Sequence, residues 1–180
     1  MATVMSFPSA GHHTKDPGAI ANGFNEFQEM DRFRNKLASF LKSKGHRYIT
    51  DNNSETNTQY QGRIKPINGD VVLDLHLNAA GPTATGCEVF VSNNASAKSK
   101  AFAQEIVDNC SKAMGIVNRG VKTESQSARK TIGILNKKGT AALIEFCFIT
   151  NKMDMKAFHD NEDCLVEIVG NLIIKYDENK

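Results

Sequence analysis

The stretch VVLDLHLNAA, residues 71–80, carries the clearest information about the fold. Its first seven residues form an apolar run that only Asp74 and His76 interrupt. A second run, TAALIEFCFITN at residues 140–151, contains a single charged residue, Glu145. Runs of this kind are typical of strands in a parallel sheet whose two faces are both covered. They predict buried strands over residues 71–77 and 141–148.

The rest of the chain alternates between short strand patterns and helix patterns. Further strands are predicted at residues 3–7, 47–50, 88–92 and 131–135. Helices are predicted over residues 25–44, 96–114 and 163–176, with a weaker one over 55–64. Ser96 is the expected N-cap of its helix, and Gly45 and Gly115 are expected just after helix ends. The alternation predicts an α/β fold with a single, mostly parallel sheet flanked by helices on both faces.

Length and composition indicate one ordinary globular domain. The chain has 180 residues, of which 40% are hydrophobic and 23% charged, enough for a sizeable core. Residues 1–176 are assigned to this domain, and residues 177–180 to a loose C-terminal tail. The net charge of +2 is too small to predict nucleic acid as a partner. The four cysteines lie far apart without a Cys-x-x-Cys pair, so buried thiols are expected rather than a cysteine zinc knuckle.

No targeting or membrane segment is recognised in the sequence. The N-terminus has neither a basic region nor a long apolar core typical of a secretory signal, and no apolar stretch could span a bilayer. Synthesis in the cytoplasm without membrane insertion is therefore expected. Charge is nonetheless uneven, because residues 118–138 hold six basic residues against one acid, Glu124. Such a stretch is usually a solvated face, but it could also contact a polyanionic surface.

Ligand-capable side chains follow several of the predicted strands. His12 comes after the first strand, His76 ends the 71–77 strand, and Glu145 lies late in the 141–148 strand. Open α/β sheets bind ligands beyond the carboxyl ends of their strands, so these residues are expected at one edge. Taken singly, a loop histidine is more often solvated and a strand histidine is more often a hydrogen-bonded core residue.

Glu26 is a fourth member of this group. It lies one helical turn before Met30, at the start of the apolar stripe of the 25–44 helix. Its alternative role is a favourable interaction with the helix dipole, worth about 0.3–1 kcal/mol. Together with His12 and His76 it favours a metal site, since two histidines and a carboxylate form a recognised catalytic zinc set. Glu145 is then the expected general base.

Several motifs in order resemble one enzyme family. They are GHHTKDPGA, an NE pair that opens a helix, DLHLNAA, GCEVFVS, NRGVK and ALIEFCFITN. The chain resembles the zinc-dependent N-acetylmuramoyl-L-alanine amidases of the third amidase family, the cell-wall hydrolases of bacteria and phage endolysins. The resemblance covers most of the chain and implies a twisted, mainly parallel sheet. It also implies His12, Glu26 and His76 as ligands of one zinc ion per chain, with Glu145 as the catalytic residue.

Two departures from the family pattern leave roles open. The family's Gly-His-Gly-Gly is Gly-His-His-Thr here, which makes His13 an extra candidate at the rim of the site. Asp74 stands where a serine is common, and it either orients a ligand or is solvated. Asn78, Asn118 and Arg119 are candidate substrate contacts, although loop and turn roles are equally expected. Strand alternation places Cys147 on the face of Glu145, where it is interpreted as a packing residue.

The resemblance implies a specific reaction and partner. The expected reaction is hydrolysis of the amide between the lactyl group of N-acetylmuramic acid and L-alanine in peptidoglycan, leading to wall lysis. The alternative is another zinc peptidase or deacetylase that acts on wall material. No separate wall-binding domain is recognised. The enzyme is expected to reach the wall after release through a phage holin or mother-cell lysis, and its oligomeric state is left open.

Overall fold

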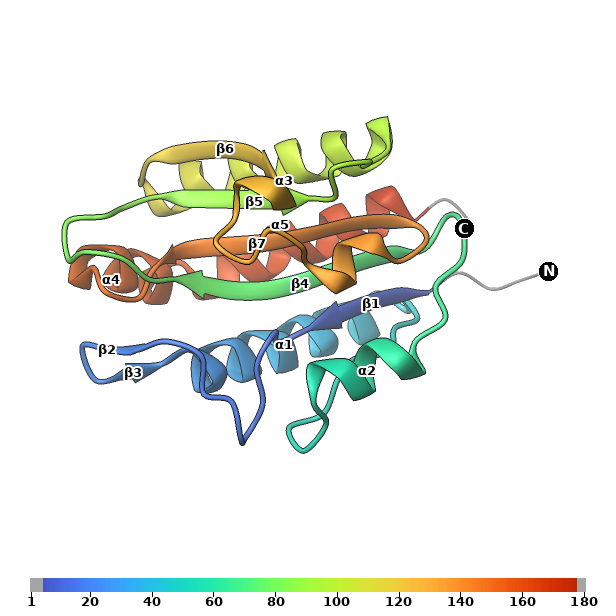
Figure 1. The fold of residues 1–180 in the computed structure, drawn as a ribbon, viewed down its shortest axis with the longest axis horizontal. Helices are drawn as coiled ribbons and strands as arrows, with labels where there is room; N and C mark the ends of the chain where they lie inside the picture. Colours follow the sequence, from blue (N-terminus) through green and yellow to red (C-terminus); the bar gives the residue numbers. More distant parts are fainter. Residues whose placement is uncertain (1–4, 178–180) are drawn as a thin grey trace.

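The central feature of the fold is a five-stranded sheet in the order β1-β4-β7-β5-β6 (Figure 1). The computed structural model describes residues 5–177. The strands of this sheet are β1 (Ser6–Ser9), β4 (Val71–Asn78), β7 (Thr140–Phe148), β5 (Cys87–Val91) and β6 (Asn118–Thr123). All neighbouring strands are parallel except β5 and β7, which are antiparallel. The predicted mostly parallel α/β sheet is confirmed.

Strands β4 and β7 lie at the centre of the sheet, as their apolar runs predict. Alternate residues of β4 point to opposite faces, so Leu73 and Leu75 join the larger core while Val72 joins a smaller one. Asp74 and His76 therefore share the face of the smaller core. His76 is paired in register with Glu145 of β7, which places the two predicted functional strand residues side by side.

The helices cover the two faces unequally. The larger core lies under α1 (Glu26–Ser43), α3 (Ala97–Met114), α4 (Lys152–Asp160) and α5 (Glu162–Tyr176). The smaller core is covered by α2 (Asn57–Arg63) and the 3₁₀ turn η2 (Gly133–Asn136), and Figure 1 shows α2 beside β1 at the edge of the sheet. Local signals set the helix ends, because Ser96 caps α3 and Gly115 ends it at a φ of 65°. The second face is thus only partly covered, and its open part carries the site.

Some predicted elements are absent or displaced. Within the described part of the chain, residues 47–50 contribute a single bridge from Tyr48 to Ser6 rather than a strand. The predicted strand over residues 131–135 is replaced by η2, which begins at Gly133. The side chains of Ile134 and Leu135 are buried in the smaller core. The first strand begins at Ser6, and residues 3 and 4 lie outside the described range.

Other elements were not predicted. Strand β6 has a mostly polar, partly exposed sequence in which apolar and polar residues do not alternate. It lies at the edge of the sheet, where a strand pairs with only one neighbour. The short strands β2 (Ile20–Ala21) and β3 (Phe24–Asn25) form a hairpin before α1. Helix α4 begins at the N-cap Asn151, whose side chain accepts from the backbone N–H of Met153. Another 3₁₀ turn, η1 (Glu124–Gln126), follows β6.

The predicted positions of Cys147 and Asp177 need correction. Cys147 packs in the larger core near Met155 rather than on the face of Glu145, because an extra residue in β7 shifts the register after His76. Asp177, assigned to a loose tail, is buried with its carboxylate 3.5 Å from His46 Nε2. Residues 178–180 of that predicted tail lie outside the described range. Among residues 5–177, no helix is long and apolar enough to cross a membrane.

Candidate metal centre and its cleft

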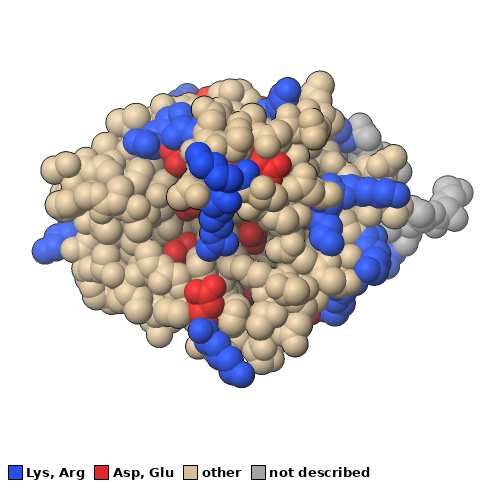
Figure 2. Space-filling view, viewed as in Figure 1, with Lys and Arg blue, Asp and Glu red and all other residues tan. Residues whose placement is uncertain are grey.

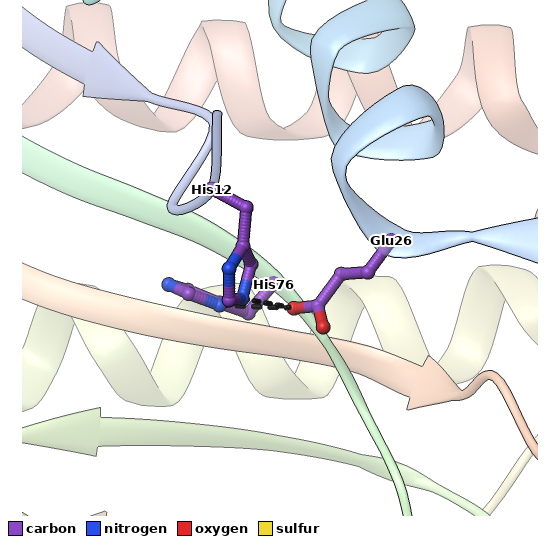
Figure 3. Close-up of side chains that lie close together, drawn as sticks. All are labelled: His12, Glu26 and His76. Carbon is purple, nitrogen blue, oxygen red and sulfur yellow. Dashed lines mark hydrogen bonds and ion pairs between the residues drawn. The ribbon is translucent and has the colours of Figure 1, made fainter. Parts of the chain in front are cut away.

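Three separate elements bring His12, Glu26 and His76 to one point (Figure 3). His12 lies in the loop after β1, Glu26 is the first residue of α1, and His76 lies near the end of β4. His12 Nε2 is 3.2 Å and His76 Nδ1 is 3.0 Å from the same atom, Glu26 Oε1. One ligand atom from each residue lies within 4.8 Å of the others, and all three residues are buried. Two nitrogens and one oxygen are a donor set that suits zinc.

A carboxylate lies near the second ring nitrogen of each histidine, the one that does not face Glu26. His76 Nε2 lies 3.1 Å from Asp74 Oδ2, and Ser9 Oγ donates to Asp74 Oδ1 at 2.5 Å. His12 Nδ1 lies 3.2 Å from Asp16 Oδ2. Carboxylates placed in this way orient ligand histidines and make the free nitrogen a better donor. Asp74 is buried, so of its two predicted roles the structure favours orientation over solvation.

Two glycines provide the space at the centre. A Cβ on Gly11 would lie 2.2 Å from His76 Nε2, and one on Gly18 would lie 2.5 Å from Glu26 Oε2. Both glycines have positive φ values, 68° and 65°, which other residues adopt at a cost. The absence of side chains here lets the loop close over the ligand atoms. The residues present therefore fit a bound metal ion.

The electrostatics of Glu26 also suit a cation. Burial acts to raise its pKa, but hydrogen bonds from His12 and His76 outweigh burial and hold the pKa far below its ordinary value. The backbone N–H groups of Ala19 and Leu77 donate to its two oxygens at 2.9 and 3.1 Å. Glu26 therefore remains ionised, and its carboxylate points into the site.

Glu145 lies beside this group on the neighbouring strand. It is paired with His76 on one side and with Glu88 of β5 on the other. Burial raises the pKa of Glu145 to about 8, and the charge of Glu26 acts in the same direction. Its Oε2 atom is buried and accepts no hydrogen bond from any described residue. A half-buried carboxylate at a cleft, with an unused oxygen and a pKa near neutrality, can take and return a proton.

A cleft of about 750 Å³ opens over these residues. It is lined by the three candidate ligands and Glu145, and also by Asn78, Glu88, Lys122 and residues 126–129. Figure 2 shows this face with acidic side chains inside a central hollow and basic side chains across it. Glu88 lines the cleft but is not among the site residues predicted from the sequence. The signal for it is a carboxylate inside a buried strand, between Cys87 and Val89.

The remaining predicted site residues are distributed differently. Asn78 lines the cleft and donates to Glu88 Oε1 at 2.8 Å. Asn118 and Arg119 are not in the cleft lining, and their side chains bond to Asp108 Oδ1 and Glu88 Oε2 at 2.7 and 2.6 Å. Both residues belong to β6 and bond to distant carboxylates, so neither has the loop or turn position of the alternative role. His13 lies apart from the ligand group, and its Nδ1 accepts from the N–H of Lys15.

Comparisons with known proteins point to one family. A family model described as N-acetylmuramoyl-L-alanine amidase matches residues 9–173. The probable autolysin PH of Staphylococcus aureus is 29% identical over 185 residues, which cover 91% of this chain and 37% of that protein. N-acetylmuramoyl-L-alanine amidase LytC of Bacillus subtilis is 28% identical over 153 residues, which cover 82% of this chain and 30% of that protein.

A phage protein and two solved structures extend these comparisons. The endolysin of Bacillus phage SPP1 is 29% identical over 79% of this chain and 54% of its own length. The crystal structure of an amidase from Clostridium difficile 630 superposes with a TM-score of 0.81 at 22% identity over both entire chains. The catalytic domain of CwlV gives a TM-score of 0.80 at 20% identity, over 99% of this chain and all of that one. These two structures share the fold. The chain spans less than half the length of the first curated relatives that it matches.

Proposed function

The chain belongs to the N-acetylmuramoyl-L-alanine amidase family, and from this premise we propose that it is a zinc-dependent hydrolase of peptidoglycan. The bond cleaved is the amide between the lactyl group of N-acetylmuramic acid and L-alanine. The observation that carries this proposal is the meeting of His12 Nε2, His76 Nδ1 and Glu26 Oε1 beside the half-buried Glu145. Residues 1–176 form the catalytic unit in this proposal.

His12, Glu26 and His76 hold one zinc ion per chain in the proposed enzyme. When bound, zinc supplies Lewis acidity that makes a water more acidic and the scissile carbonyl more electrophilic. Asp74 keeps the His76 ring turned toward the ion through its outer nitrogen, and Asp16 lies 3.2 Å from the outer nitrogen of His12. Glu26 contributes the negative charge that the two neutral histidines lack.

Glu145 moves the proton. It accepts a proton from the attacking water as that water's oxygen bonds to the lactyl carbonyl carbon. It then donates this proton to the nitrogen of L-alanine as the amide C–N bond breaks. The products are the lactyl carboxylic acid on the glycan and a stem peptide with a free amino terminus. The raised pKa of Glu145, about 8, suits both the acceptance and the return of the proton.

A role in wall lysis is part of the proposal. Two relatives carry the names autolysin and endolysin, and both describe lytic enzymes. We expect peptidoglycan to be the partner of this chain and the cell wall to be where it acts. Release through a phage holin or by mother-cell lysis is the route by which it reaches the wall.

The test measures metal and product separately. Elemental analysis of purified protein should give one zinc per wild-type chain and none for His12→Ala, Glu26→Ala or His76→Ala. The matched control, His13→Ala, should retain zinc, because His13 lies apart from the ligand atoms. Full zinc in His76→Ala, or loss of zinc from His13→Ala, would contradict the ligand set.

Mass spectrometry identifies the bond that is cleaved. A soluble muramoyl peptide should yield the free lactyl acid and the complete stem peptide. A shortened peptide would indicate a zinc peptidase, and release of acetate would indicate a deacetylase. Either of these products would overturn the proposed reaction, even if the zinc assignment is correct.

A further inference from the structure

The basic stretch at residues 118–138 does not form one cationic surface. Arg119 and Lys122 both bond to Glu88, at 2.6 and 2.5 Å. The Lys137 ammonium donates to the backbone carbonyl of Gln61, and that of Lys130 to the carbonyl of Ser125. Among residues 5–177, no hydrogen bond or ion pair joins the side chain of Arg129 to another residue, and Arg129 lines the catalytic cleft.

The loop that carries Arg129 is held in place by a buried carboxylate. Glu124 is 3% exposed and accepts hydrogen bonds from residues at the C-terminal end of the loop and from the two residues that follow β5. The donors are the backbone N–H groups of Ile132 and Asn93 and the side chains of Ser92 and Asn136. This network holds residues 125–131 against the cleft, so the position of Arg129 is part of the fold.

Charge in the cleft explains what a cation would do there. The other charged groups of the lining are mostly carboxylates: Asp16, Glu26, Asp74, Glu88 and Glu145. Lys122, the other lysine or arginine in this lining, already neutralises Glu88. Apart from the zinc ion proposed above, Arg129 is therefore the cation of this lining that no carboxylate among residues 5–177 pairs with, and it is free to bind an anionic ligand. Guanidinium groups bind carboxylates through two parallel hydrogen bonds.

We propose that Arg129 binds a carboxylate of the stem peptide, close to the scissile amide. This proposal deepens the proposed function and rests on it, because it names the part of the substrate that the cleft recognises. Stem peptides carry acidic side chains or free α-carboxylates beyond L-alanine. Phosphates of other wall polymers share this anionic chemistry. The stem peptide is the source chosen here, since Arg129 and Glu145 line the same cleft.

Two soluble muramoyl peptides test the proposal. They differ only in the residue after L-alanine, whose carboxylate is free in one and amidated in the other, and neither contains phosphate. With the zinc-loaded wild-type enzyme, KM should be lower for the free carboxylate. In Arg129→Gln, KM for that substrate should rise roughly tenfold, the loss expected for one charge-assisted contact, while kcat changes little. The preference between the two substrates should disappear.

Two further variants separate this contact from general electrostatics. Lys130→Gln removes the same charge from the same loop but from a residue outside the cleft lining, so it should retain the wild-type preference. Arg129→Lys keeps the charge but not the planar guanidinium group. Its KM for the free-carboxylate substrate should lie between those of wild type and Arg129→Gln.

The outcomes that would overturn the proposal are specific. They are equal KM values for both substrates in the wild-type enzyme, an unchanged preference in Arg129→Gln, and an equal loss in Lys130→Gln. A different result is that the enzyme binds better to sacculi that retain phosphate polymers and shows no preference between the two peptides. That result would assign Arg129 to wall phosphates and overturn the proposal. Failure of the wild-type enzyme to cleave either peptide would instead contradict the proposed function.

Discussion

Glu145 is the residue at which metal binding and chemistry can be separated. Glutamine keeps the size and hydrogen-bonding capacity of glutamate but cannot accept the proton. Glu145→Gln should therefore fold and retain zinc, while release of stem peptides from purified peptidoglycan falls by about 10²–10⁴-fold. A folded, zinc-loaded variant with activity within a few-fold of wild type would remove Glu145 from the mechanism. Loss of zinc would make it a ligand instead.

The same residue should give the metal-free protein a characteristic pH dependence. Its pKa rises from an ordinary 4.5 to about 8 on burial, so the fold favours the protonated carboxyl. The free energy of unfolding should therefore decrease between pH 4.5 and 8, as the unfolded chain releases this proton first. Glutamine stays neutral throughout. At pH 8, metal-free Glu145→Gln should melt at least about 2–4 °C above metal-free wild type, and the difference should vanish near pH 4. A pH-independent difference would contradict the assignment.

Asp74 is a residue for which the sequence allows two roles, orientation of a ligand or solvation. Its contact with His76 Nε2 and the hydrogen bond from Ser9 predict that it orients His76 toward the metal. In Asp74→Ala, the zinc dissociation constant should rise about 10–100-fold in a chelator competition assay. Asp74→Asn keeps an acceptor without the charge and should show a smaller change. Equal zinc affinity in all three proteins would show that His76 needs no such support.

At the scale of elements, the loop between β6 and β7 depends on one side chain. Glu124→Ala would leave the backbone N–H groups of Ile132 and Asn93 without their acceptor, whereas Ser92 would still donate to Asn136. Unsatisfied buried donors cost about 1–3 kcal/mol each, so a loss of at least about 1 kcal/mol in unfolding free energy is expected. Hydrogen exchange in residues 125–132 should accelerate more than in β4. Uniform acceleration across the sheet would indicate a global loss of stability instead.

At the scale of the whole molecule, zinc should couple distant parts of the chain. Its proposed ligands come from the β1 loop, from α1 and from β4, which meet only in the folded protein. A ligand that binds only the folded state at 100 times its dissociation constant stabilises it by about 2.7 kcal/mol. For a chain of this size, the melting temperature should fall by roughly 5–10 °C when zinc is removed. His76→Ala should melt at the same temperature with and without zinc, and an equal zinc-dependent shift in that variant would contradict the coupling.

The sequence by itself determined the features that depend on neighbouring residues. The mostly apolar runs at 71–77 and 141–148 specified the central strands, because strands in the middle of a covered parallel sheet are largely apolar. Ser96 and Gly115 specified the ends of α3, because caps act within one helical turn. The motifs also named His12, Glu26 and His76, whose ligand atoms lie within 4.8 Å of one another, and Glu145, which is paired with His76. Local patterns were sufficient for these features.

Only the tertiary structure decided the features that depend on distant partners. Residues 131–135 have the pattern of a strand, yet residues 133–136 form the 3₁₀ turn η2, because Ile134 and Leu135 pack in the smaller core. Strand β6 has no apolar signal of its own and forms because β5 offers an unpaired edge. Asp74, Arg119 and Arg129 are all charged residues in the sequence, but one contacts a histidine, one pairs with Glu88 and one faces the cleft. The role of a charged side chain is set by the groups that surround it in space, and most of those groups are far away along the chain.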